Sequence, residues 1–197
     1  MLNNLNLTEL ELSILSEVGN IGAGNAANSL SMLVNKPVSL NVPEVQLCKL
    51  TELSDRVAGA EEIRTGIMFG VAEGLNGFIC FILEDSDVKK LVDIFGYDME
   101  PTLILSEIGN IISGAYVGAL STLMDEFINI SPPECSRDMT GALLDSLISH
   151  LSSAADETVF IKTEMTIEER ELTSYYILLL EQDSLVKLID KMKKSVG

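Results

Sequence analysis

The sequence repeats itself at an offset of 90 residues. The stretch ILSEVGNIGAGNAANSLSMLVNKPVSLNVPE, which starts at Ile14, aligns with ILSEIGNIISGAYVGALSTLMDEFINISPPE, which starts at Ile104. Both stretches end in a Pro-Glu pair, at Glu44 and Glu134. Because self-similarity at a fixed offset indicates an internal duplication, we interpret the chain as two copies of one unit, at residues 8–97 and 101–195.

The later parts of the two copies agree in hydrophobic pattern rather than in identity. Each copy has a strict alternation typical of a half-buried strand, then a continuous apolar run, then apolar residues at helical spacing. The alternations are Ile63, Thr65, Ile67, Phe69, Val71 and Val159, Ile161, Thr163, Met165, Ile167. The apolar runs are GFICFIL at 77–83 and YYILLL at 175–180, and the helical sets are Val88, Leu91, Val92, Phe95 and Leu185, Leu188, Ile189, Met192.

These patterns predict the same order of elements in each copy. A long helix comes first, followed by a strand near residues 38–47 or 128–135, a short helical connection, two strands in a hairpin and a closing helix. In the second copy the connection, GALLDSLISHLSSAA, is the longer. Strands joined by short turns favour antiparallel pairing, so we predict an α+β fold with pseudo-twofold symmetry. No linker separates the copies, and we expect one domain with a shared core.

Charge and cysteine content restrict the partners and the compartment. The formal net charge of -17 argues against nucleic acid and anionic membranes as partners and favours a partner with a basic face. Cys48, Cys80 and Cys135 are odd in number and widely spaced in apolar surroundings, which suits buried residues in a reducing compartment. The longest apolar runs are shorter than a membrane span, and the N-terminus lacks the pattern of a signal peptide. We therefore expect a cytoplasmic protein.

Gly22, Gly24 and Ala27 match the spacing G-x-G-x-x-A of a dinucleotide-binding loop. Such a loop must follow a strand and open a helix. Here the preceding apolar residues recur at helical spacing, and Thr8 with Glu11 resembles a capping box, so the glycines are expected inside a helix that starts near residue 8. The repeated feature is instead small residues three to five apart, which predict close approach of another helix or strand: Gly19, Ala23, Ala26 and Gly109, Ser113, Gly118.

The spacing Glu-x-x-Asn also occurs in both copies, as Glu17 with Asn20 and Glu107 with Asn110. Residues three apart in a helix lie side by side on one face. A single such pair is most often part of a solvated helix face. Asn is, however, a poor residue for a helix interior, and its recurrence beside Glu favours a use for its side chain, although duplicated ancestry alone also explains part of the match.

The segments ELSILSEVGNIGAGNAA and SEIGNIISGAYVGALS together resemble the CheC family of chemotaxis phosphatases, which is related to CheX and FliY. The resemblance covers essentially the whole chain. The family motif is Asp or Ser, three residues, Glu, two residues and Asn. The first copy has all three residues, Ser13, Glu17 and Asn20, whereas the second has Leu103 in place of the Asp or Ser.

The resemblance implies hydrolysis of the phosphoryl group on the aspartate of a CheY-type response regulator. Asn20 and Asn110 would each hold the attacking water in line without repelling the phosphoryl anion, since an amide is neutral and offers both donors and an acceptor. Glu17 and Glu107 would dock against a basic residue of the regulator, with Ser13 as an accessory residue. Magnesium is expected on the phosphorylated partner and no cofactor on this chain, and His150 is expected to be a surface or core residue rather than a ligand or base.

Two other functions fit the same resemblance. The middle domain of the switch protein FliM is similar in fold and binds partners without hydrolysis, which gives a scaffold alternative. CheC proteins also associate with the receptor deamidase CheD, which gives an adaptor role that can coexist with phosphatase activity. A cofactor-dependent enzyme is the least favoured alternative, because the glycine string lacks the required context.

Overall fold

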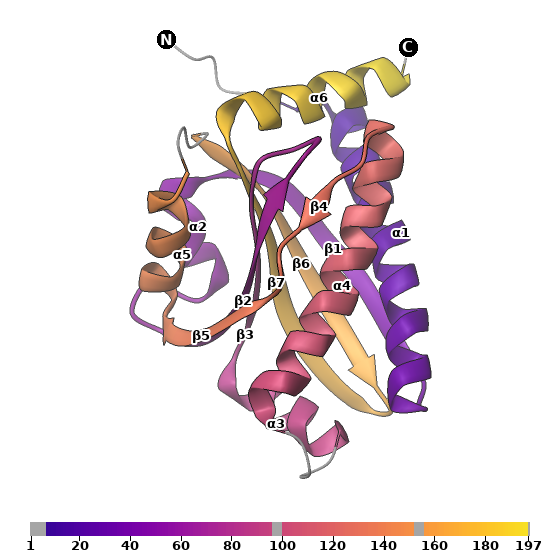
Figure 1. Cartoon of the computed structure of the whole chain (residues 1–197), viewed down its shortest axis with the longest axis vertical. Coiled ribbons are helices and arrows are strands. Elements are labelled where there is room, and N and C mark those ends of the chain that lie inside the picture. The colour runs from indigo at the N-terminus through magenta and orange to yellow at the C-terminus, as the bar shows by residue number, and fades with distance from the viewer. Residues whose placement is uncertain (1–6, 96–99, 152–155, 197) are drawn as a thin grey trace.

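The computed structural model describes residues 7–95, 100–151 and 156–196 (Figure 1). The first half contains α1 (Glu9–Val34), β1 (Val38–Lys49), the 3-10 turn η1 (Leu50–Glu52), α2 (Leu53–Val57), β2 (Ile63–Ala72), β3 (Gly77–Leu83) and α3 (Asp85–Phe95). The second half contains α4 (Pro101–Met124), β4 (Asn129–Ile130), β5 (Glu134–Met139), α5 (Thr140–Ser149), β6 (Glu157–Ile167), β7 (Arg170–Leu180) and α6 (Gln182–Val196).

The long helices α1 and α4 begin and end where local chemistry allows. Thr8 caps α1, and its side chain and that of Glu11 bond each other's backbone N–H groups, which completes the predicted capping box. Proline at the first position opens α4. Both helices end on a residue in the left-handed conformation, Asn35 (φ 52°) and Asp125 (φ 54°), a conformation that Asn and Asp tolerate. These two residues stand 90 positions apart, the offset of the repeat.

The described strands form one antiparallel sheet of seven strands, which confirms the predicted α+β class. Its order is β1-β6-β7-β3-β2-β4, and β5 also pairs with β2. The hairpins β2–β3 and β6–β7 pair as the alternations predicted. β1 lies at an edge of the sheet and is interrupted by a bulge between Asn41 and Glu44. This location accommodates Pro43, which cannot donate a ladder hydrogen bond.

One predicted strand, near residues 128–135, is instead two. β4 pairs with Val71 and Ala72 of β2, whereas β5 pairs with residues Ile63 to Met68 of the same strand. The chain between them contains Pro132 and Pro133, which lack the N–H groups that a continuous ladder needs. Sequence alternation alone did not reveal this break.

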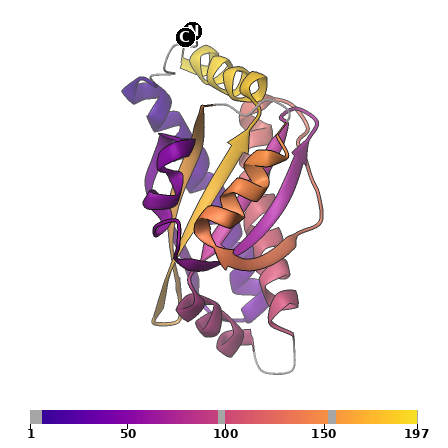
Figure 2. The ribbon, with the colours of Figure 1, turned by 90° about the vertical axis from the view of Figure 1, so that its left-hand side faces the viewer.

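Helices cover both faces of the sheet. On one face lie α1 and α4, side by side, with α3 and α6 near the two ends (Figure 1). On the other face lie α2 and α5, which Figure 2 shows in front of the strands. The first face carries the larger hydrophobic core, and the second a smaller cluster that includes Leu53, Leu144 and Phe160.

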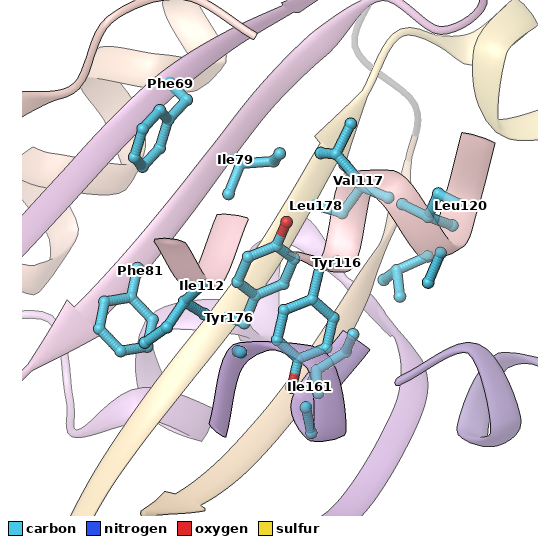
Figure 3. Close-up of a cluster of buried hydrophobic side chains, with 14 of the residues drawn as sticks. Phe69, Ile79, Phe81, Ile112, Tyr116, Val117, Leu120, Ile161, Tyr176 and Leu178 are labelled. Atoms are coloured by element: carbon cyan, nitrogen blue, oxygen red, sulfur yellow. The ribbon is translucent and has the colours of Figure 1, made fainter. Parts of the chain in front are cut away.

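The larger core holds α4 firmly against the sheet. The rings of Tyr116 on α4 and Tyr176 on β7 are stacked with their centroids 4.5 Å apart, among buried residues that include Phe81 and Ile112 (Figure 3). Of the described helices, α4 alone is long and apolar enough to cross a membrane by length and composition, and 56% of its most apolar window is buried inside the protein. This burial is that of a core helix in a folded domain.

The cysteines divide between core and surface. Cys48 and Cys80 are buried, as predicted, whereas Cys135 is only half-buried on β5, so the prediction of three core cysteines was wrong for that residue. All three are free thiols. Cys135 lies at the margin of the larger core, where its Sγ atom is 3.4 Å from the Ser106 hydroxyl of α4, and the packing there covers it only in part.

Candidate active site

The first copy of the motif lies on the exposed side of α1. Leu15, Val18 and Gly19 face the sheet and are buried, and this orientation leaves Glu17 and Asn20 exposed to solvent, together with Ser13. The spacing of four and three residues places the three side chains along one face of the helix.

The second copy lies in the same way on α4. Ile104, Leu105 and Ile108 are buried, while Glu107 and Asn110 are exposed. Leu103, which stands at the position of Ser13, is also exposed, with 58% of its surface accessible. An exposed leucine has no hydroxyl or carboxylate to offer at this position, so the second copy keeps only the Glu-Asn pair.

The exposed stripe continues beyond the motif on both helices. Five exposed positions in α1 each have an exposed counterpart in α4, 90 residues later, although two of the five side chains differ in type. The positions are Ser13, Glu17, Asn20, Gly24, Asn28 in α1 and Leu103, Glu107, Asn110, Gly114, Gly118 in α4. The two helices therefore present matching faces to solvent.

The helices run antiparallel, which separates the two motifs. Gly22 of α1 lies against Tyr116 of α4, and Ile14 and Leu123 line the same groove between the helices. In this register Asn20 is roughly level with Gly118, eight residues beyond Asn110, or about 12 Å along the helix axis. The Glu-Asn pairs thus form two distinct sites in one helical layer.

The motif side chains have no partners in the part of the chain that the structure describes. Among residues 7–95, 100–151 and 156–196, Glu17, Asn20, Glu107 and Asn110 make no side-chain hydrogen bond or ion pair. Each carboxylate is free to pair with an external cation, and each amide is free to accept from or donate to an external group. A Glu-Asn pair of this kind can hold a basic side chain and a water molecule next to each other.

The glycine string and His150 add no catalytic side chain to this face of α1 and α4. Gly22, Gly24 and Ala27 lie inside α1 rather than at a helix N-terminus, so the dinucleotide-binding interpretation fails, as expected. His150 is exposed at the end of α5, on the opposite face of the sheet, where its Nδ1 atom lies 2.6 Å from the Ser146 carbonyl oxygen. Within the described part of the chain, no group of three or more His, Cys, Asp and Glu side chains is arranged to hold a metal ion.

The packing role predicted for the small residues holds for some and not for others. A Cβ added at Gly109 would come 2.7 Å from Ile67, and one at Gly19 would touch Val42 at 3.4 Å, so these glycines allow close approach. At Gly118 an added Cβ would meet nothing within 4 Å, so the prediction for this residue was wrong. Gly24 and Gly114 are equally open. Each of these two glycines follows the Asn of its copy by four residues, so the sequence already indicated that they lie on the exposed face of the helix rather than in a packed contact.

Comparisons with known proteins agree on the family. The sequence model of the CheC-like family matches residues 10–47 and 104–137, and each of these segments contains one Glu-x-x-Asn copy. The CheY-P phosphatase CheC of Bacillus subtilis is 30% identical over 195 residues, which cover 92% of this chain and 93% of the relative.

Solved structures show the same fold. FliY of Thermotoga maritima superposes with a TM-score of 0.75 at 23% identity, covering 96% of this chain and 99% of that one. The FliM middle domain of H. pylori superposes with a TM-score of 0.68 at 13% identity, covering 94% and 99%. At these identities the two structures support the architecture alone.

Proposed function

The chain belongs to the CheC-like family, and from this premise we propose that it hydrolyses the aspartyl phosphate of a CheY-type response regulator. The observation that carries the proposal is the pair of exposed Glu-Asn sites. Both lie in the segments that the family model matches, and neither has a side-chain partner among the residues that the structure describes. The B. subtilis relative, which aligns over nearly its whole length, is named a CheY-P phosphatase.

In the proposed mechanism, the Asn residues act on the water. Phosphoryl transfer needs chiefly positioning and charge stabilisation. The amide of Asn20 or Asn110 orients a water molecule in line with the phosphorus, and its neutrality avoids repulsion of the phosphoryl anion. Both residues stand on long helices whose buried faces pack against the sheet, which supports a fixed position for the water.

The Glu residues act on the regulator rather than on the phosphate. Glu17 and Glu107 pair with a basic side chain beside the phosphorylated aspartate and so fix the docked complex. The charge of -17 favours approach of such a basic surface. Magnesium belongs to the phosphorylated regulator in this scheme, and the chain contributes no metal ligands. A soluble regulator of this kind places the reaction in the cytoplasm.

The decisive experiment follows the phosphorylated regulator directly. Candidate CheY-type regulators are phosphorylated with labelled phosphate, and the loss of label is timed with no added protein, with this protein, and with a variant carrying Asn20→Ala and Asn110→Ala. We expect the wild-type protein alone to accelerate the loss. Equal decay in all three samples for every candidate regulator contradicts the proposal.

A non-catalytic scaffold is the second candidate, favoured by the likeness in fold to the FliM middle domain. It predicts tight binding of a partner with no acceleration of dephosphorylation and no effect of the two Asn substitutions. Binding of a CheD deamidase is a separate proposal that is compatible with either function. Titration with purified CheD tests it independently.

A further inference from the structure

A groove lies between α1 and α4 beside the first motif. It has a volume of about 330 Å³ and is open to solvent. Apolar residues dominate its lining, and Glu17 is part of it: Ile14, Glu17, Val18, Ile21, Asn25, Gly118, Ala119, Thr122 and Leu123. Glu17, which is proposed to pair with the regulator, therefore also lines this groove.

The groove is built to receive an apolar group. The Thr122 hydroxyl donates to the Gly118 carbonyl oxygen at 3.0 Å, so the polar atom of this side chain is already satisfied. Ile21 leaves 47% of its surface accessible on the groove wall. Covering such a side chain is favourable by about 25 cal/mol for each Å² of apolar surface removed from water. The open space at Gly118, where an added Cβ meets nothing within 4 Å, lets another side chain enter.

We propose that this groove receives an apolar side chain of the response regulator, next to the basic residue that pairs with Glu17. The inference rests on the proposed function and names how the regulator is held at the first site. The carboxylate and the apolar lining are continuous, since Glu17 belongs to both and has no partner among the described residues. A basic side chain flanked by an apolar one complements that combination of charge and shape.

The second site differs at the corresponding positions. By the offset of the repeat, Asn28 corresponds to Gly118 and Met32 to Thr122. Both replacements are larger, and Met32 leaves 78% of its surface accessible. The groove beside the first site is therefore lined by smaller side chains than the corresponding surface beside the second site. We expect the regulator to prefer the first site.

Filling the groove tests the inference. Gly118→Leu inserts a side chain into open space, and leucine is the better helix former, so the fold should be retained or stabilised. Each site is isolated by reversing the charge at the other: Glu107→Arg leaves the first site, and Glu17→Arg leaves the second. Affinity is measured for the beryllofluoride-activated regulator, in which the phosphate is mimicked and no turnover occurs. Turnover of the phosphorylated regulator is measured in parallel.

We expect Gly118→Leu to weaken binding at least tenfold when the first site is isolated and less than twofold when the second is isolated. Ser146→Leu, on the exposed side of α5 across the sheet, is the matched control and should change neither. An unchanged affinity at the first site, or equal weakening at both sites, overturns the inference. If Gly118→Leu lowers the melting temperature, Gly118→Ala replaces it and should weaken the first site alone, by a smaller factor.

The two proposals fail in different ways. If the regulator binds without any turnover and Gly118→Leu weakens this binding at the first site, phosphatase activity is refuted but the groove is supported. Turnover with no effect of Gly118→Leu on the Kd or the KM supports the phosphatase and overturns the groove. If no activated regulator binds the wild-type protein, both are overturned.

Discussion

Gly22 of α1 lies directly against Tyr116 of α4. A Cβ built on Gly22 would fall 2.8 Å from Cδ1 of the tyrosine and 3.0 Å from its Cα, closer than atoms pack in a folded protein. The tyrosine ring cannot give way freely, because it is stacked on Tyr176 at 4.5 Å. This contact fixes how close the two helices come and hence the relative position of the Glu-Asn sites on their outer faces.

Two glycines in the same helix should therefore respond oppositely to alanine. Gly22→Ala forces α1 and α4 apart, and we expect it to lower the free energy of unfolding by about 1–3 kcal/mol. Gly24→Ala adds a methyl group in open space and improves helix propensity, and we expect a gain of about 1 kcal/mol. Urea unfolding of both variants measures the difference. A loss of stability for Gly24→Ala would show that the open space is occupied in the folded protein.

The sequence predicted close packing of this layer but not which residues provide it. Small residues three or four apart indicate that a helix face is approached closely. Which glycine meets a neighbour depends on the rotation and register of the two helices, and these are set by long-range packing. Gly22 was outside the repeated set and packs against Tyr116 of α4, whereas Gly118 was inside it and faces solvent.

Acid should weaken the fold in part through the α1 cap. The Glu11 carboxylate accepts hydrogen bonds from the Thr8 backbone N–H at 2.6 Å and from the Thr8 hydroxyl at 2.7 Å, which lowers the pKa of Glu11. A carboxyl with a lowered pKa stabilises the fold fully above its ordinary value of 4.5, and this contribution is lost as the pH falls through the folded-state pKa. Glu11→Gln should therefore reduce the slope of unfolding free energy against pH between about pH 5 and pH 3.

The ion pair of Asp85 with Arg137 gives a control for that measurement. The guanidinium donates to Asp85 and lowers the pKa of its carboxyl, so this pair also weakens in acid. Asp85→Asn should leave the contribution of Glu11 to the slope intact. If Glu11→Gln and the wild type have the same slope, the cap does not contribute to the acid sensitivity.

The three thiols should react at very different rates. Burial raises the pKa of Cys48 to about 11 and that of Cys80 to about 12. At pH 8 about one Cys48 thiol in a thousand is then ionised, even before access is considered. Cys135 is half-buried at the sheet margin and should be the one thiol that a chromogenic disulfide reagent modifies quickly in the native protein. Cys135→Ser should remove the fast phase, and denaturant should expose the remaining two thiols.

The antiparallel sheet and the exposed motif could be predicted because both depend on local pattern. Alternating strands with short turns specify hairpins, and the buried set on each helix leaves Glu and Asn on the opposite side. The groove between α1 and α4 could not be predicted, since it joins residues 14–25 to residues 118–123 and requires the helix register. The break between β4 and β5, by contrast, could have been predicted, because two adjacent prolines mark it in the sequence.

Magnesium dependence should arise from the regulator alone. The described residues contain no cluster of ligands for a metal ion, and magnesium prefers carboxylate oxygens arranged octahedrally. Calorimetric titration of magnesium into the isolated protein should show no stoichiometric tight site, while turnover of the phosphorylated regulator should require magnesium. A tight site that is lost in Glu17→Gln or Glu107→Gln would favour metal-assisted hydrolysis instead.

Substitution of the glutamates should mainly affect docking. Glu17→Gln and Glu107→Gln each remove a charge that pairs with the regulator but leave the neighbouring Asn in place. We expect a higher KM with a similar kcat at the altered site, measured while the other site is disabled, and a smaller effect at high salt, where exposed ion pairs are screened. A fall in kcat with an unchanged KM would assign the carboxylate to the chemical step.

The asparagines should divide the catalytic work between the two sites. Asn20→Ala and Asn110→Ala should each remove the contribution of one site, and only the double variant should lose turnover, by about 100-fold or more, because misplacing the water costs that much in the transition state. The kcat should fall more than the KM rises, in contrast to the Glu variants. Both residues are exposed and alanine is the better helix former, so the melting temperature should hold or rise slightly. The first site, which retains Ser13, should be at least as active as the second, where Leu103 replaces that residue. Full activity in the double variant would refute the proposed role of both amides, even with the family assignment intact.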